Sequence, residues 1–145
     1  MKTLLIIEDE RLFGSELSLH YRSQGWEVSW ASTLAEAKQL LLKKNIDPLL
    51  ILSDMNLPDG NALDFMEEIK KKVVYAEWLF LTAYGSVPDS VRALRLGAYD
   101  FLEKPCDLDR LDLVISSATR SATIQRRLIE QTNQEHKRYS PEAYL

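Results

Sequence analysis

The segment that decides the fold is Leu49-Leu50-Ile51-Leu52-Ser53-Asp54-Met55-Asn56-Leu57-Pro58-Asp59-Gly60. Its first five positions are almost all apolar, as in a strand that is covered on both faces. Asp54 follows this run directly, and Pro58 and Gly60 predict a sharp bend in the loop behind it. Open parallel α/β sheets bind their ligands at the carboxyl ends of the strands. The segment therefore predicts a buried strand that presents the Asp54 carboxylate at a binding edge.

A second acidic group occupies the same kind of position near the start of the chain. The apolar run at residues 4–7 is followed at once by Glu8-Asp9-Glu10. Two parallel strands that bring carboxylates to one edge form a site for a hard divalent cation, or for chemistry on a carboxylate.

Short apolar runs alternate along the chain with longer segments of helical period. Strands are predicted at residues 4–7, 26–31, 49–53, 76–82 and 99–102. Helices are predicted at residues 12–23, 34–44, 62–71 and 87–96, and a last helix begins near residue 109. Thr33 and Glu36 fit a capping box, and Gly25 and Gly97 fit the residue just past a helix end. This alternation predicts a single α/β domain with a parallel sheet and right-handed crossovers.

Composition places the chain among ordinary globular proteins. Of its 145 residues 46% are apolar and 28% are charged, and a net charge of −4 gives no general attraction for nucleic acid or anionic membrane. No apolar stretch approaches the ~20 residues that cross a bilayer, and no signal peptide opens the chain. The single cysteine, Cys106, cannot form an internal disulfide. These features favour the cytoplasm.

The last helix carries an apolar stripe that continues past the predicted end of the compact domain. The stripe steps by four and three residues through Leu111, Ile115, Ala118, Ala122, Gln125 and Ile129. It gives way to polar residues, and Tyr139-Ser140-Pro141 closes the helix. Two interpretations remain open: a solvated helical tail, or a signalling helix that pairs with a second copy of the chain. The stripe holds only about two good heptads, so a coiled coil built on it would be weak.

The ends of the later strands bring further polar side chains to the acidic edge. Thr82 ends the fourth predicted strand, and Lys104 follows the fifth. Carboxylates that share one place repel each other, so the site needs a counter-charge. An all-oxygen set without histidine or cysteine suits Mg²⁺ and disfavours zinc and copper. Lys104 offers a cation and Thr82 a hydroxyl for an anion beside the metal, which equips the site to carry a phosphoryl group on Asp54.

Four segments form a set that recurs in one known family: residues 5–10 (LIIEDE), 53–60 (SDMNLPDG), 81–85 (LTAYG) and 97–105 (GAYDFLEKP). Together they make the chain resemble the receiver domain of two-component response regulators, most of all receivers of the nitrogen-regulation type. Each motif alone is weak, but all four occur in order, each at a strand end. The resemblance covers residues 1–120 and implies a flavodoxin-like, doubly wound (βα)5 fold with strand order 2-1-3-4-5. Residues 121–145 are then expected to form a helical linker or dimerisation extension.

The resemblance implies a role for each matching residue of the acidic edge. Asp54 would be the phosphoacceptor for a histidine kinase. Asp9, Asp54 and the backbone carbonyl of Asn56 would bind Mg²⁺, and Glu8 would hold a metal-bound water. Many family members have aspartate at the position of Glu8, so here the carboxylate stands on a longer arm.

The remaining matching residues are implied to bind phosphate or to act as a switch. Thr82, next to Ala83, would close on the phosphoryl oxygens, and Lys104 would pair with Asp54 or its phosphate. Phe101 stands at the aromatic switch position, where tyrosine is commoner, and its rotation inward would accompany the movement of Thr82. A static core aromatic is the open alternative for Phe101. The family usually has a cis bond before the proline that matches Pro105, so a cis Lys104–Pro105 bond is expected.

The leading functional interpretation is a Mg²⁺-dependent phosphoacceptor that passes a kinase's signal through its last helix. The expected output is transcription regulation by a sigma-54-type ATPase domain, which would make this chain a fragment; a free-standing receiver is the alternative. Another alternative is a receiver-like dimerisation module that is not phosphorylated. A phosphatase of the haloacid-dehalogenase type would need a second acid at Asn56. A receiver is expected to show only self-phosphorylation from phosphodonors and autodephosphorylation.

Overall fold

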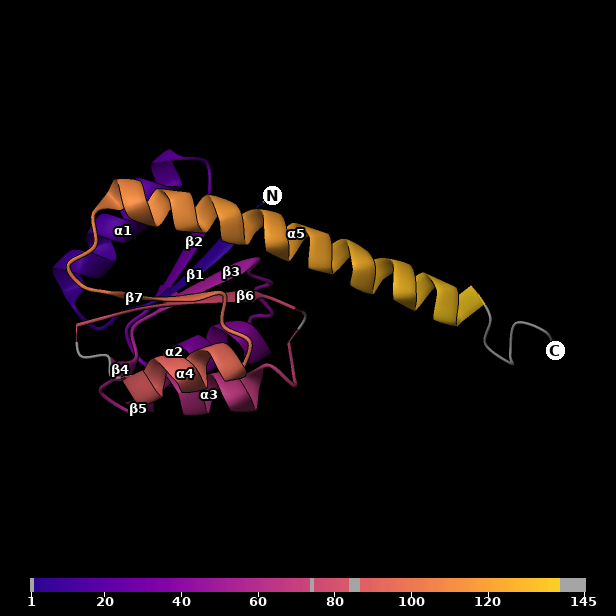
Figure 1. Ribbon diagram of the computed structural model, residues 1–145, viewed down its shortest axis with the longest axis horizontal. Coiled ribbons are helices and arrows are strands. Elements are labelled where there is room, and N and C mark those ends of the chain that lie inside the picture. The colour runs from indigo at the N-terminus through magenta and orange to yellow at the C-terminus, as the bar shows by residue number, and fades with distance from the viewer. Residues whose placement is uncertain (1, 74, 84–86, 139–145) are drawn as a thin grey trace.

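Within the described residues, a parallel sheet of five strands forms the centre of the protein (Figure 1). The computed structural model describes residues 2–73, 75–83 and 87–138. The strands are β1 (Thr3–Ile7), β2 (Glu27–Ala31), β3 (Leu50–Ser53), β6 (Glu77–Thr82) and β7 (Asp100–Glu103). Their order is β2-β1-β3-β6-β7. This is the predicted order 2-1-3-4-5 for the strands of this sheet, and the flavodoxin-like fold is confirmed.

Helices cover both faces of the sheet (Figure 1). On one face lie α1 (Arg11–Ser23) and α5 (Leu108–Arg138), and on the other lie α2 (Leu34–Lys38), α3 (Ala62–Ile69) and α4 (Val87–Arg95). Each face has its own apolar core, because successive strand residues point to opposite sides. In β1, Leu5 and Ile7 belong to the core under α2–α4, and Leu4 and Ile6 belong to the core under α1 and α5. All four are fully buried, as the unbroken apolar run predicted.

The neighbouring strands β1 and β3 end at the same edge of the sheet. Their register pairs Ile7 with Ser53, and the N–H of Asp54 donates to the carbonyl of Ile7 at 2.9 Å. This pairing places the residues that follow β1 beside Asp54.

Two local features differ from the sequence prediction. Behind β3 the chain forms a short antiparallel pair, β4 (Asn56–Leu57) and β5 (Gly60–Asn61), where only a loop was predicted. The helix predicted over residues 34–44 is α-helical only through Lys38 and continues as a π-helix, η1 (Gln39–Lys43). The apolar spacing could not distinguish the two helix types, because Leu41 reaches the core from the π-helical turn as well.

The predicted helix ends are largely confirmed. Gly25 and Gly97 have positive φ angles of 92° and 98°, the conformation that ends a helix most easily at glycine. The Oγ1 of Thr33 accepts the N–H of Glu36 at 3.1 Å, as a capping box requires. The Glu36 carboxylate, however, accepts the N–H of Ser32 at 3.0 Å, one residue before the expected position.

Asp59 caps α2 from a distant part of the chain. Its two carboxylate oxygens accept the N–H groups of Leu34 and Ala35 at 2.9 Å each. These bonds hold the pKa of Asp59 below its usual value. The turn between β4 and β5 is thereby tied to α2, which anchors the segment that follows Asp54.

The apolar stripe of α5 belongs in its first part to the domain core. Four positions pack under the helix against the sheet and are almost fully buried: Leu111, Ile115, Ala118 and Ala122. They are not available to a second copy, so a seam built on this stripe would lie beyond Ala122. Gln125 and Ile129 are exposed there. The predicted closing segment at residues 139–141 lies outside the described residues.

A polar cluster fastens α5 to the amino end of the sheet. The Nε of Arg126 donates to the carbonyl of Tyr75 at 2.8 Å, and its terminal nitrogens donate to the Asp47 carboxylate at 2.8 Å each. Glu77, which is 4% exposed, accepts hydrogen bonds from the Ser121 hydroxyl at 2.7 Å and the Tyr75 hydroxyl at 2.9 Å. The helix is therefore held to the sheet as far as Arg126.

α5 is one continuous helix across the predicted domain boundary at residues 120 and 121. Where the receiver ends and its extension begins stays a prediction. None of the helices in the described part of the chain is long and apolar enough to cross a membrane.

Candidate functional site

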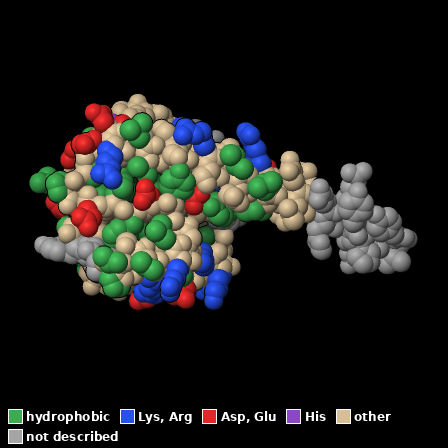
Figure 2. Space-filling view, in the orientation of Figure 1, with side chains coloured by type: hydrophobic (Ala, Val, Ile, Leu, Met, Phe, Trp, Pro, Cys, Tyr) green, Lys and Arg blue, Asp and Glu red, His purple; other side chains and the backbone are tan. Residues whose placement is uncertain are grey.

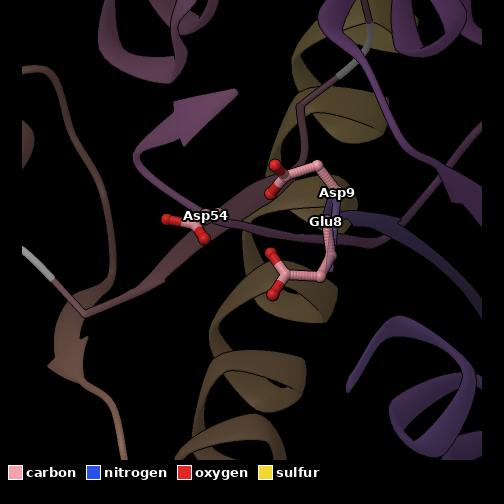
Figure 3. A group of neighbouring side chains, drawn as sticks. All are labelled: Glu8, Asp9 and Asp54. Carbon is pink, nitrogen blue, oxygen red and sulfur yellow. The ribbon is translucent and has the colours of Figure 1, made fainter. Parts of the chain in front are cut away.

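Three carboxyl groups meet at the carboxyl edge of the sheet (Figure 3). Glu8 and Asp9 follow β1, Asp54 follows β3, and each offers an oxygen within 4.8 Å of the other two. The carboxyl groups of Glu8 and Asp9 both point toward Asp54. Glu8 is buried, Asp54 is half-buried and Asp9 is exposed. The structure thus brings together the acidic residues that the sequence placed at two strand ends.

Lys104 bridges two of these carboxylates. Its Nζ lies 2.5 Å from Glu8 Oε1 and 3.1 Å from Asp54 Oδ2, and Glu10 Oε2 lies 3.8 Å away. The exposed fractions of the Lys104, Glu8 and Asp54 side chains are 14%, 3% and 13%. Such low exposure shields the contacts from solvent, so they interact more strongly than an ion pair on the surface.

The backbone orients the Asp54 carboxylate. The N–H of Met55 donates to Asp54 Oδ1 at 2.6 Å, while Oδ2 faces Lys104. The N–H of Asn56 lies 3.5 Å from Oδ1, at the outer limit of a hydrogen bond. Both carboxylate oxygens therefore have donors, and the side chain still reaches solvent.

Burial and neighbouring charges shift the pKa values of Glu8 and Lys104. It raises the pKa of Glu8 to about 7, although the hydrogen bond and the charge of Lys104 oppose the rise. For Lys104, burial alone would lower the pKa, but the hydrogen bonds and charges of Glu8 and Asp54 outweigh it and raise the pKa. Lys104 therefore stays a cation, and the site has more carboxylates than one lysine can neutralise.

The donor set suits a hard divalent cation. Its ligands are all oxygens, which Mg²⁺ prefers. Glu8 Oε2 is buried and has no hydrogen-bond partner within the described residues. Buried polar atoms normally have a partner, so this oxygen is one that a hydrated cation would satisfy. Asn56, whose carbonyl was the remaining predicted ligand, begins β4 two residues after Asp54.

The strands β6 and β7 bring Thr82 and Lys104 to the same edge. Thr82 is the last residue of β6, is buried, and accepts the N–H of Lys104 at its carbonyl at 2.8 Å. Ala83 follows and is exposed, and residues 84 and 85 of the predicted motif lie outside the described residues. The Lys104–Pro105 peptide bond is cis, the geometry that the resemblance implied.

Phe101 lies half-buried in β7, opposite Phe80 of β6. It contacts the core under α2–α4 and borders an open groove of about 610 Å³ that Val87 and Ser90 of α4 also line. The role of Phe101 as a switch stays a prediction.

Two residues near the site, Phe13 and Trp30, were not predicted to belong to it, and Glu10 was predicted only as part of the acidic group. Glu10 approaches Lys104, and the ring of Phe13 lies 4.7 Å from the Lys104 ammonium, within range of a cation–π contact. Phe13 lies in the first turn of α1, which begins two residues after Asp9. The indole N–H of Trp30 donates to the carbonyl of Glu8 at 2.9 Å. No sequence signal points to this bond, because it depends on the register between β1 and β2.

Comparisons with known proteins agree with this geometry. A model of the response regulator receiver domain matches residues 4–116. The response regulator protein PilR of Pseudomonas aeruginosa is 36% identical over 116 residues, which are 80% of this chain and 26% of PilR. The regulatory protein LuxO of Vibrio cholerae is 39% identical over 90 residues, which are 62% of this chain and 20% of LuxO. This chain therefore spans about a quarter or less of the length of these relatives.

Solved structures give the same result. The solution structure of the beryllofluoride-activated NtrC4 receiver domain dimer has a TM-score of 0.77 and 34% sequence identity. The match covers 84% of this chain and 99% of the NtrC4 chain. The likeness therefore extends over the whole of that receiver.

Proposed function

Because this chain belongs to the response regulator receiver domain family, we propose that Asp54 accepts a phosphoryl group from a histidine kinase with the help of Mg²⁺. The observation that carries the proposal is the position of Lys104, 2.5 Å from Glu8 and 3.1 Å from Asp54, beside the acidic group of Figure 3. A buried cation at this point offsets the charge that phosphorylation adds.

The metal would be held by Asp9, Asp54 and the backbone carbonyl of Asn56, with Glu8 holding one of its waters. The buried Oε2 of Glu8, which has no hydrogen-bond partner among the described residues, and the exposure of Asp9 to solvent support this assignment. Bound Mg²⁺ would supply positive charge against the phosphoryl oxygens.

In the transfer, an oxygen of the Asp54 carboxylate attacks the phosphorus of a phosphohistidine. A P–O bond forms while the P–N bond breaks, and the imidazole leaves with the electron pair and takes up a proton. The N–H of Met55, 2.6 Å from Oδ1, keeps the carboxylate from turning during the approach. The modification takes the side chain from a charge of about −1 to about −2 and adds acceptor oxygens. Lys104 and Thr82 are the side chains of this edge that supply donors for them.

The new oxygens would shift the population between two packings of the surface formed by α4, β7 and α5. Thr82 and Ala83 close on the phosphoryl group, and Phe101 turns inward from the groove beside α4. The half-buried position of Phe101 and the volume of that groove support this step.

We infer that the full-length protein carries a C-terminal output domain that regulates transcription, of the sigma-54-type ATPase class. The small share of PilR that this chain spans supports a longer protein. The extension of α5 to Arg138, and the dimeric state named for the NtrC4 receiver, support a linker helix that pairs with a second copy. Direct contact of this chain with nucleic acid is not part of the proposal.

The proposal is tested by adding beryllofluoride or acetyl phosphate with Mg²⁺ and measuring the intact mass and the amide NMR spectrum. We expect an adduct on Asp54 that needs Mg²⁺ and is absent from Asp54→Asn. A wild-type protein without any Mg²⁺-dependent response would overturn the proposal in favour of an unphosphorylated interaction module. We expect no turnover of external phosphoesters beyond self-phosphorylation and autodephosphorylation, and such turnover would favour a phosphatase.

A further inference from the structure

Both main-chain polar groups of Glu8 form hydrogen bonds with residues of β2. Its N–H donates to the carbonyl of Ala31 at 3.0 Å, and its carbonyl accepts the indole N–H of Trp30 at 2.9 Å. The first bond continues the pairing of β1 with β2, but the second comes from a side chain that reaches beyond the ladder. The carbonyl of Glu8 belongs to the peptide group that joins Glu8 to Asp9. The direction of this peptide group sets where both carboxylates leave the backbone.

Gly14 makes room for this indole. It lies buried in the first turns of α1, and a Cβ at this position would overlap Cζ2 and Cε2 of Trp30 and lie 2.7 Å from its Nε1. Any larger residue would therefore push on the donor atom itself. Glycine inside a helix costs about 1 kcal/mol relative to alanine. The close contact with the indole explains why α1 nevertheless has glycine at position 14.

We propose that Trp30, seated on Gly14, is a positioning residue that fixes the Glu8–Asp9 peptide group for cation binding. The inference rests on the proposed function, because it assumes that Glu8 and Asp9 face a divalent cation. Trp30 itself touches neither the cation nor Asp54 in this scheme. It acts through the carbonyl of Glu8, in the way that hydrogen-bond partners of metal ligands hold them in a productive orientation.

The proposal separates the indole N–H from the packing of the ring. Trp30→Phe keeps an aromatic ring over Gly14 and removes the donor. We expect it to weaken Mg²⁺ binding by about tenfold, the low end of the loss seen when a group that orients a metal ligand is removed. Thermal stability should fall modestly as well, because the bond is also made without the metal. Trp26→Phe is the matched control, because Trp26 is buried at the amino end of the sheet, where its ring lies under Lys2. We expect Trp26→Phe to leave Mg²⁺ affinity unchanged.

A second pair of variants tests the part played by Gly14. Gly14→Ala in the wild-type background should weaken Mg²⁺ binding, because the new methyl displaces the indole. In a Trp30→Ala background there is no indole to displace, so Gly14→Ala should cause no further loss. Additive losses in the two backgrounds would contradict a shared mechanism.

The affinities are measured by calorimetric titration with Mg²⁺ alone, and the indole N–H signals are followed by NMR. The Trp30 signal, identified by its loss in Trp30→Phe, should shift on adding Mg²⁺, while the Trp26 signal should not. A folded Trp30→Phe protein with wild-type Mg²⁺ affinity would overturn the positioning role and leave the proposed function standing. A wild-type protein that binds no Mg²⁺ would overturn both.

Discussion

Arg126 binds the carboxylate of Asp47 through two hydrogen bonds of 2.8 Å, one from each terminal nitrogen of the guanidinium. Paired bonds of this kind fix the direction of both side chains as well as their distance. Asp47 lies just before β3 and Arg126 lies on α5, so the pair determines where the last helix leaves the domain. The part of α5 around Arg126 is thus fixed against the sheet and is not a loose tail.

Replacing Arg126 should loosen this end of the helix. We expect Arg126→Ala to lower the free energy of unfolding by about 1–3 kcal/mol, because several hydrogen bonds are lost at a site that is only partly screened by solvent. Arg126→Lys should recover only part of the loss, since an ammonium cannot make the paired contact. Urea denaturation measures the three proteins. Equal unfolding free energies for all of them would show that the contact contributes nothing.

The part of α5 beyond the sheet should mediate self-association. Figure 2 shows hydrophobic side chains exposed along the helix where it leaves the body of the domain. Ile124 and Leu128 are 55% and 50% exposed and lie one turn apart. We expect replacing both by glutamine to lower the dimer fraction in light scattering. Leu113→Gln is the control, because Leu113 is 73% exposed but lies on the part of α5 that covers the sheet. If the control disrupts the dimer instead, the interface lies elsewhere.

Lys104 should be needed for stability chiefly when no metal is bound. We expect Lys104→Met to lower the unfolding free energy in EDTA by about 3 kcal/mol, because Glu8 and Asp54 lose their buried counter-charge. Added Mg²⁺ should restore part of this loss, since it supplies charge at the same edge. Thermal unfolding with and without Mg²⁺ measures both effects. Loss of the same size in both conditions would mean that Mg²⁺ and Lys104 do not share a site.

Glu8 should make the metal-free protein less stable as pH rises. Its pKa is about 7 in the folded state against an ordinary value of 4.5. The folded state therefore keeps a proton that the unfolded chain releases, so the stabilisation is complete below about pH 4.5 and is lost as pH rises through 7. The change amounts to up to about 3 kcal/mol. We expect Glu8→Gln to remove this contribution, so the difference between the two proteins in EDTA isolates it. Parallel pH profiles for both would contradict the shift.

The sequence predicted the sheet well because a strand that is buried on both faces has an almost unbroken run of apolar residues. Each strand of the main sheet begins and ends within one residue of its predicted position, and β1 and β3 were the clearest apolar runs. The pair β4 and β5 was missed because its strands are too short to show a period of two. The π-helical turn was missed because one extra residue in a turn leaves the apolar pattern almost unchanged.

For the site, the sequence predicted which side chains share an edge but not how they are held. Asp54, Asp9, Thr82 and Lys104 were expected together because parallel strands end on one side. The burial of Glu8, the bridge made by Lys104 and the bond from Trp30 depend on side-chain reach and strand register. These are properties of packing, and short motifs do not encode them.

The cap that Asp59 makes on α2 has a consequence for the length of the segment between Asp54 and Asp59. The segment is fixed at one end by β3 and at the other by the bonds of Asp59 to the start of α2. Its length must therefore match the distance between these two points. A residue inserted or deleted there would either remove the Asp59 cap from α2, at a cost of about 1 kcal/mol, or pull Asp54 away from the end of β3. The segment should therefore tolerate a substitution at the exposed Pro58 better than a change of length. The position of Asp54 relative to its partners therefore depends on α2, which binds the other end of this segment through Asp59.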